Sequence, residues 1–178
     1  MDQADIILER YLDNYITENG LDMLLNETGI LYESKDIVFN NIPSDSYLHA
    51  TTSIPCNFCD KKEIMIMIDQ ECLDNEGHPD TKALKLINFF DKNSKKVEKE
   101  CYTQLRKYIE TTDSHEAKRL LGVDKIPNDI SSIVKPEYIV IDNKYNLIFA
   151  FEMSWDEHGL AVVYKNGKFT AKSQDEVW

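Results

Sequence analysis

Apolar residues recur along this chain with two different spacings. In residues 2–19 they lie three or four positions apart, which predicts an amphipathic helix, and residues 21–27 predict a second, shorter one. The pattern then changes to alternation and short apolar runs, which predict strands over residues 30–39, 46–54 and 63–69. The chain is therefore expected to begin with helices and to continue with strands.

The strand expected over residues 63–69, EIMIMID, is apolar at every position from Ile64 to Ile68. A continuous apolar run of this kind is typical of a strand that is covered on both faces. We therefore expect this strand to lie centrally in a sheet.

Helical spacing returns after the turn-rich segment 74–80. Asp80 is a start signal for one helix, Asn93 or Ser94 can cap another, and residues 115–122 form a third short piece that ends on a glycine. The apolar residues at helical spacing are Leu84, Ile87, Phe90, Val97, Cys101, Leu105 and Tyr108. Two or three helices thus separate two strand-rich parts.

The last third of the chain carries four strand patterns, at residues 136–142, 146–153, 159–165 and 168–171. The last two are joined by Asn-Gly at 166–167, the dipeptide that favours a tight hairpin turn. Short connections of this kind predict an antiparallel meander.

Together these patterns predict an α+β fold: an antiparallel sheet or sheets with an N-terminal helix, a central helical pair and a C-terminal β-meander. The length of 178 residues and the hydrophobic content of 42% suit a single globular domain. Its expected parts are a helical segment at 1–29, strands at 30–70, helices at 79–122 and the meander at 136–178.

The formal net charge of −12 limits the partners that we expect. Nucleic-acid binding depends on Lys and Arg that neutralise phosphates, so we expect no nucleic-acid partner, whereas a basic protein would be attracted. The N-terminus lacks a signal peptide, and no apolar run is long enough to cross a membrane. We therefore expect a soluble cytoplasmic protein that does not bind membranes, although acidity can also serve solubility alone.

Four cysteines stand at Cys56, Cys59, Cys72 and Cys101. The first two form a C-x-x-C pair, which can chelate zinc or act as a redox couple, but the other two lack the paired spacing of a zinc site. The pair also precedes a turn and a strand, whereas a thioredoxin-like pair opens a helix. Ordinary half-buried thiols are the favoured interpretation.

The segment WDEHG, residues Trp155, Asp156, Glu157, His158 and Gly159, is the candidate functional motif. Alternation along the preceding strand places Trp155 last in an apolar stripe that begins at Leu147. Asp156 can accept from backbone amides of the turn, and Gly159 can adopt the backbone angle that other residues avoid. A structural corner with Glu157 and His158 at its tip therefore accounts for the motif.

This corner has two chemical alternatives. Ser154, Asp156 and His158 cannot form a catalytic triad, because neighbours in a tight turn point in diverging directions. A metal site is more plausible, with Asp156 and His158 as ligands and His115, Glu116 or Asp175 approaching from elsewhere. Phosphate-loop, dinucleotide, hydrolase and zinc-protease motifs are absent from the sequence, so we expect neither a cofactor nor a catalytic residue from those classes.

The stretch NLIFAFEMSWDEHGLAVVYKNGKF, followed by SQDEV, resembles the C-terminal part of several uncharacterised bacterial families of small α+β proteins. The matching positions are Phe151, Trp155, Asp156, Glu157, His158, Gly159, Leu160, Gly167 and Asp175. In those families an extra residue usually separates Trp-Asp from Glu-His-Gly, so the corner here is one residue shorter. Some members resemble immunity proteins, which bind and block a toxin domain.

Two functions of different classes follow. The resemblance and the acidity favour a non-enzymatic binding protein, immunity-like in role, with a basic toxin domain as partner and exposed aromatics such as Tyr145, Tyr164 and Trp178 in its interface. The alternative is a metal-binding protein or metal-assisted hydrolase that uses the WDEHG corner.

Overall fold

The computed structural model describes residues 40–41, 48–112 and 114–178. The helices expected over residues 2–19 and 21–27 and the strand expected over 30–39 lie outside the described residues. The strands are β1 (Asn40–Asn41), β2 (Leu48–Phe58), β3 (Lys61–Asp69), β4 (Val134–Ile141), β5 (Leu147–Met153), β6 (Leu160–Lys165) and β7 (Lys168–Ser173). The helices are α3 (Thr81–Thr111) and α4 (Ser114–Leu121), with short 3₁₀ turns η2 (Gln70–Cys72), η3 (Ile130–Ser132) and η4 (Gln174–Glu176). The predicted α+β fold is confirmed for this part of the chain.

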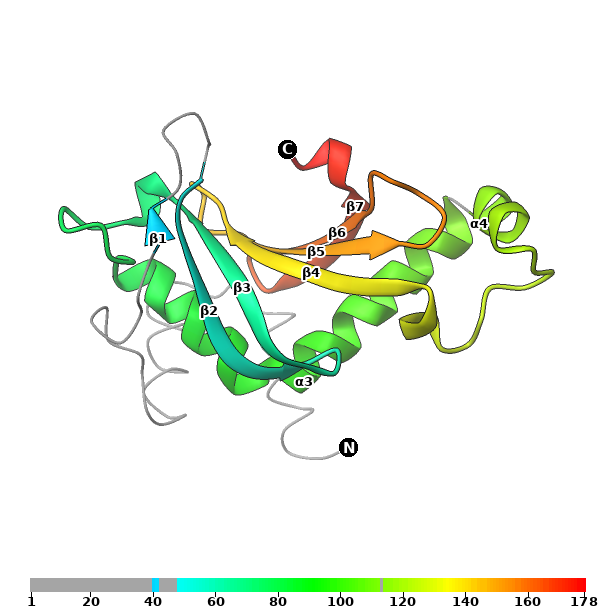
Figure 1. Ribbon diagram of the computed structural model, residues 1–178, viewed down its shortest axis with the longest axis horizontal. Coiled ribbons are helices and arrows are strands. Elements are labelled where there is room, and N and C mark those ends of the chain that lie inside the picture. Colours follow the sequence, from blue (N-terminus) through cyan, green and yellow to red (C-terminus); the bar gives the residue numbers. More distant parts are fainter. Residues whose placement is uncertain (1–39, 42–47, 113) are drawn as a thin grey trace.

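The described strands form one seven-stranded sheet in the order β1-β2-β3-β4-β5-β6-β7 (Figure 1). Six short connections would have made every pair antiparallel, but α3 and α4 lie between β3 and β4 in the chain. This crossover returns the chain to the edge from which β3 started, so β3 and β4 are parallel, with Ile66 opposite Ile139. The expectation of a wholly antiparallel sheet is wrong at this one pair. The C-terminal meander β4 to β7 is antiparallel, as predicted.

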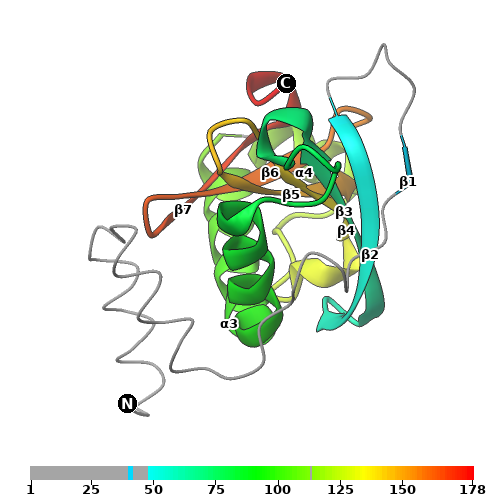
Figure 2. The same ribbon diagram turned by 90° about the vertical axis from the view of Figure 1, so that its left-hand side faces the viewer.

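Helix α3 covers one face of the sheet and contacts β2, β6 and β7 (Figures 1 and 2). It begins as predicted, because the Asp80 carboxylate accepts from the Ala83 amide at 2.8 Å. The expected break at Asn93 is only a kink. Asn93 has non-helical angles (φ −117°, ψ 16°), but its side-chain amide donates to the Phe89 carbonyl at 2.9 Å. One kinked helix therefore replaces the two that the sequence predicted there.

The main core lies between α3 and the sheet, and aromatic rings fill its centre. Phe58 contacts Phe90 edge to face, with ring centroids 5.3 Å apart, and lies 5.7 Å from Phe149. Phe89 stacks on Tyr164 at 4.9 Å. The predicted stripe of β5 is also confirmed, since Leu147, Phe149, Phe151 and Met153 are buried in this core.

The other face of the sheet has a much smaller cover. Val140, Ile148 and Ala161 form a separate buried cluster, against which Val177 packs from the segment that follows η4. Figure 1 shows η4 on the side of the sheet opposite α3. The two faces thus differ in how completely they are shielded from water.

This difference corrects the expectation for β3. The strand lies inside the sheet, between β2 and β4, as predicted. Its burial alternates, however: Ile64, Ile66 and Ile68 are buried in the main core, whereas Met65 is 39% exposed. In contrast, β5 is covered on both faces, since all five residues from Leu147 to Phe151 are buried. Among the described residues, no helix is long and apolar enough to cross a membrane.

Candidate functional site

The WDEHG segment forms the corner between β5 and β6. Trp155 is half-buried and packs against the main core, while Glu157 and His158 are exposed. Asp156 Oδ1 accepts from the His158 amide at 2.9 Å, and β6 begins at Leu160. Each of these features agrees with the structural interpretation of the corner.

Gly159 is required at this corner for two reasons. Its φ is +70°, in the left-handed region that favours glycine. A Cβ at this position would also lie 2.6 Å from the Phe151 carbonyl oxygen and 2.6 Å from Gln174 Nε2. The backbone of the corner is therefore in close contact with both β5 and η4.

Gln174 is the residue that joins η4 to the corner. Its side chain is 9% exposed, and its Nε2 lies 3.3 Å from the Phe151 carbonyl oxygen and 3.4 Å from the Leu160 carbonyl oxygen. Its Oε1 accepts from the Trp178 indole at 3.5 Å. No pattern in the sequence indicated this role, because Gln174 stands in a polar run beside Asp175.

The structure brings together only some of the expected metal ligands. His158 Nδ1 lies 3.4 Å from Asp175 Oδ1, and its Nε2 lies 3.7 Å from Glu157 Oε1. Glu116 pairs instead with Arg119 on α4. Within the described ranges, no group of three or more His, Cys, Asp and Glu side chains could hold a metal ion. For the metal-site alternative, His158 thus contacts Asp175 and Glu157 through different ring nitrogens, while the expected ligand Asp156 accepts from the His158 backbone amide instead.

The cysteines lie in apolar surroundings. Cys56 and Cys59 are half-buried at the β2–β3 hairpin, Cys72 and Cys101 are buried, and all four are free thiols. Burial raises the pKa of the Cys59 thiol to about 12, even though Tyr102 hydrogen-bonds to it. A thiol with a raised pKa is a poor nucleophile and a poor metal ligand at neutral pH. This geometry agrees with ordinary thiols.

Half-buried and exposed apolar side chains lie on the face of the sheet opposite α3. We call the open patch the group Met65, Met67, Tyr138, Val163, Val177 and Trp178. Met67, Tyr138, Val163 and Val177 pack against the small buried cluster, Met65 pairs with Tyr138 across β3 and β4, and Trp178 follows Val177. Trp178 is 56% exposed. Of the other aromatics expected in an interface, Tyr164 is buried in the main core, and the Tyr145 hydroxyl donates to Asp80 at 2.5 Å. The expectation for Tyr164 is wrong because its side chain points toward α3.

Acidic side chains border one end of the open patch. The acidic rim consists of Glu137, Glu157, Asp175 and Glu176, all exposed. Glu137 lies 3.4 Å from the Gln174 amide, and Glu157 and Asp175 flank His158. The corner and η4 therefore place negative charge beside an exposed tryptophan.

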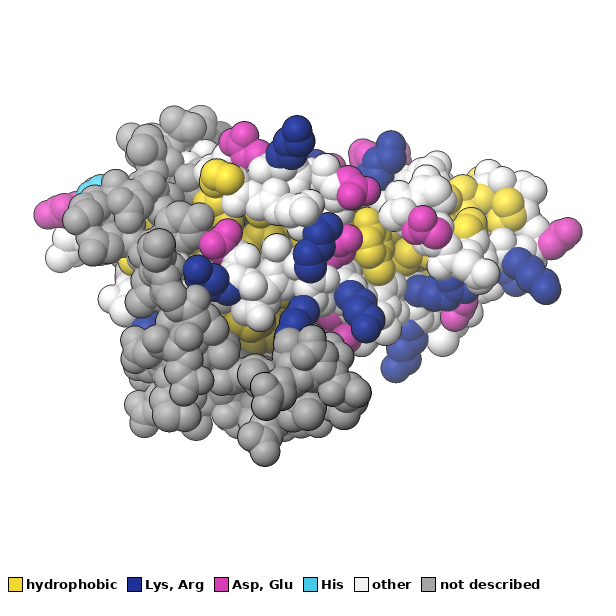
Figure 3. Space-filling model, turned by 90° about the horizontal axis from the view of Figure 1, so that it is seen from below, with side chains coloured by type: hydrophobic (Ala, Val, Ile, Leu, Met, Phe, Trp, Pro, Cys, Tyr) yellow, Lys and Arg dark blue, Asp and Glu magenta, His cyan; other side chains and the backbone are white. Residues whose placement is uncertain are grey.

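Charge is divided unevenly between the parts of the chain. Residues 81–125, which contain α3 and α4, have 11 Lys and Arg against 7 Asp and Glu, whereas 51–80 and 126–178 together have 7 against 15. Figure 3 shows Lys and Arg side chains spread over the α3 face toward α4, with Asp and Glu between them. The sheet side of the molecule is thus acidic and the helical side is basic.

A family model described as "Domain of unknown function (DUF6985)" matches residues 38–177. The chain belongs to this family. The DUF6985 region contains the whole described sheet, both helices, the corner and η4. No curated protein and no solved structure matches the chain.

The bounds of the DUF6985 match also show which part of the chain carries most of the net charge. Residues 1–50, most of which precede the match, contain ten Asp and Glu against two Lys and Arg. Residues 51–178 contain 22 against 18. Most of the acidity therefore does not come from the DUF6985 region, and within that region the acidic part is the sheet side.

Proposed function

We propose that the protein is a non-enzymatic cytoplasmic binding protein whose open patch docks a basic protein domain. The observation that carries this proposal is the open patch itself, in which Met65 and Trp178 remain 39% and 56% exposed beside a buried cluster. Contiguous exposed apolar surface with a polar border is typical of protein interaction sites.

The chemistry of the partner follows from the surroundings of the patch. The acidic rim lies at one end of it, and the sheet side carries an excess of Asp and Glu. Complementary charge accelerates the encounter of two proteins, while apolar and aromatic side chains hold the complex. A basic toxin domain fits this chemistry, and its neutralisation is the role that we propose.

The residues of the WDEHG corner contribute to this role by position. Asp156 and Gly159 shape the turn, and Gly159 and Gln174 hold η4 against it, so Glu157, Asp175 and Trp178 are presented together. In this proposal the corner is a scaffold for the rim and for one end of the patch.

The test uses three tagged baits: the wild-type protein, Met65→Lys and Leu120→Lys. Leu120 is 46% exposed on α4 and is therefore a matched control for an apolar-to-charged change away from the sheet. We expect a basic protein that wild type and Leu120→Lys capture and that Met65→Lys loses. Equal capture by all three baits, or no basic partner, would contradict the proposal.

The electrostatic part is tested with the captured partner. Glu157→Lys combined with Asp175→Lys should slow association and reduce its dependence on salt, because both changes lie on the acidic rim. The control is Glu71→Lys combined with Glu76→Lys, which makes the same charge change near η2. The toxin-neutralising role predicts that the partner alone arrests growth and that co-expression of this protein restores it.

A further inference from the structure

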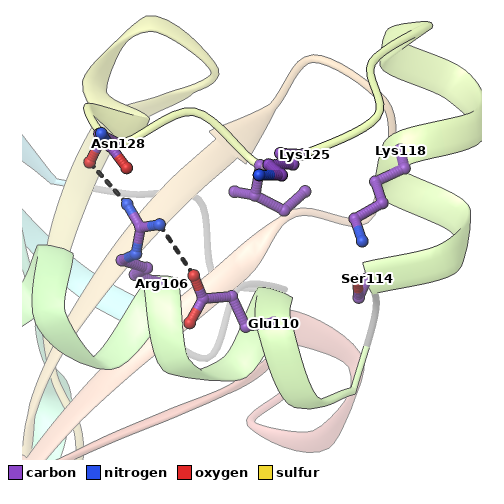
Figure 4. Close-up of a pocket in the computed structure, with 7 residues that line it drawn as sticks. Arg106, Glu110, Ser114, Lys118, Lys125 and Asn128 are labelled. Carbon is purple, nitrogen blue, oxygen red and sulfur yellow. Dashed lines mark hydrogen bonds and ion pairs between the residues drawn. The ribbon is translucent and has the colours of Figure 1, made fainter.

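A cleft lies between the second half of α3, α4 and the loop that follows α4. Its volume is about 340 Å³, and it is lined by Arg106, Glu110, Ser114, Lys118, Lys125, Ile126 and Asn128 (Figure 4). Pockets of about 300–1,000 Å³ are the usual size for small ligands. The cleft is on the basic side of the molecule, away from the open patch.

Arg106 fixes one wall of the cleft. Its Nη1 donates to the carbonyl oxygens of Pro127 and Asn128 at 2.9 Å and 2.6 Å, and its Nη2 pairs with Glu110 at 2.8 Å. These bonds hold the loop against α3, and the buried Ile126 lies beneath it. The wall is therefore formed before any ligand arrives, which lowers the entropic cost of binding.

Two ammonium groups of the cleft have no such partners. Within the part of the chain that the structure describes, neither the Lys118 ammonium group nor the Lys125 ammonium group has a hydrogen bond or an ion pair. Figure 4 shows the Lys118 side chain extending from α4 toward Ser114, across the cleft from Arg106 and Glu110. The described lining residues thus bring three cations, one carboxylate and a serine hydroxyl to the cleft.

We propose that this cleft binds the phosphate group of a small anion, either inorganic phosphate or a phosphomonoester. The Arg106 fork is already engaged by Glu110 and two carbonyls, so it is not available for the bidentate pairing that selects a carboxylate. Lysine ammonium groups act as point charges that suit a dianion with several acceptor oxygens. The size of the cleft limits the ligand to a small molecule.

The ligand affinity is expected to be modest because the cleft is open to water and its charges are screened by salt. A dissociation constant in the millimolar range at low ionic strength is the expected value for inorganic phosphate. Saturable amide chemical-shift changes at residues 114–118 and 125–128 on titration of the full chain would report it. Sodium chloride at matched ionic strength is the control for screening alone.

Variants of the cleft test the assignment. Lys118→Gln combined with Lys125→Gln should weaken phosphate binding by about tenfold, as expected for the loss of two screened ion contacts. Lys107→Gln combined with Lys144→Gln, at exposed sites outside the cleft, should leave it unchanged. Glu110→Gln should tighten binding several-fold, because it removes the carboxylate that the described residues contribute to the cleft while both carbonyl bonds still hold Arg106.

Glycerol phosphate, titrated in parallel, distinguishes the two sources of the phosphate group. Tighter binding of the ester identifies a phosphomonoester as the ligand, and binding of inorganic phosphate alone identifies the free ion. Absence of saturable shifts in the cleft with either probe would overturn the proposal, as would an unchanged affinity in the Lys118 and Lys125 double variant. Loss of the proposed protein partner would leave these results unaffected, because the open patch contributes no residue to the cleft.

Discussion

The two faces of the sheet are built from the same strands but differ in how completely their side chains are buried. On the covered face, large aromatic and branched side chains meet α3 and are almost completely buried. On the open face, the described residues form a buried cluster of three small or medium side chains, and the methionine, tyrosine and valine side chains packed against it remain partly in water. The covered face holds the main core of the fold, and the open face is the surface that we propose for a partner.

The difference is visible within single strands. In β3, isoleucines alternate with methionines, and the isoleucines take the covered side. Methionine is flexible and polarisable, which suits a surface that adapts to another protein. The alternation of isoleucine with methionine thus distinguishes the covered face of β3 from its open face. A pattern of hydrophobic and polar positions alone does not distinguish them.

The largest effect that we predict is on the covered face. Phe149→Ala removes a ring that contacts Phe58, Phe90 and Phe169, with centroids 5.7, 5.7 and 6.3 Å apart. We expect the free energy of unfolding to fall by about 3–5 kcal/mol, as for other buried phenylalanine truncations. Urea unfolding followed by circular dichroism measures this, with Phe149→Leu as the control that restores most of the volume. A loss below about 1 kcal/mol would mean that the covered face is not the main core.

The next prediction concerns Gly159, where the corner is in close contact with both β5 and η4. Gly159→Ala places a Cβ against the Phe151 carbonyl oxygen and Gln174 at a φ of +70°. We expect a loss of at least about 2 kcal/mol from the strained backbone and the displaced neighbours. His158→Ala, one residue earlier and exposed, is the control and should change stability by less than about 0.5 kcal/mol. If the two variants behaved alike, the close packing of η4 against the corner would be in doubt.

A third prediction concerns the pH dependence of the stability of the covered face. Burial raises the pKa of Cys59 and of Cys72 from 9.0 to about 12, and both thiols lie against the main core. Above pH 9 the unfolded chain releases these protons while the folded chain retains them, so stability falls as the pH rises from 9 toward 12. Urea unfolding at neutral pH and near pH 10 measures the loss, which should be smaller than that of Gly159→Ala. Cys59→Ala should show a weaker pH dependence, and an identical slope would contradict the assignment.

Local signals predicted much of this fold. The Asp80 cap, the paired positive φ values at Asn166 and Gly167 and the four strands of the meander all follow from interactions between near neighbours in sequence. The parallel pairing of β3 with β4 depends on how a long helical crossover returns to the sheet. A one-dimensional pattern contains that information only as the presence of helices between strands.

The candidate site was predictable to a similar depth. The shape of the WDEHG corner could be derived from residue types, since Asp156 and Gly159 act within the turn. The role of Gln174 could not, because its partners Phe151 and Leu160 are distant in sequence and are reached only after the strands pair. The cleft between α3 and α4 likewise joins Arg106 to carbonyls more than 20 residues away. Long-range polar contacts of this kind leave no periodic trace.

The smallest effect that we predict is on the open face, where two neighbouring residues of β3 allow a direct comparison of the two faces. Met65 and Ile66 are neighbours on β3 with opposite environments, 39% and 0% exposed. We expect Met65→Ala to change the free energy of unfolding by less than about 1 kcal/mol, whereas Ile66→Ala should cost about 2–5 kcal/mol. Both variants are measured by urea unfolding of the isolated protein and again with the captured partner present. The partner stabilises the folded protein, and this stabilisation is the difference between the free energies of unfolding with and without the partner. If Met65 belongs to the interface, the difference is smaller for Met65→Ala than for wild type, whereas it is unchanged for Ile66→Ala. If instead Ile66→Ala reduced the stabilisation by the partner and Met65→Ala did not, the interface would lie on the α3 side.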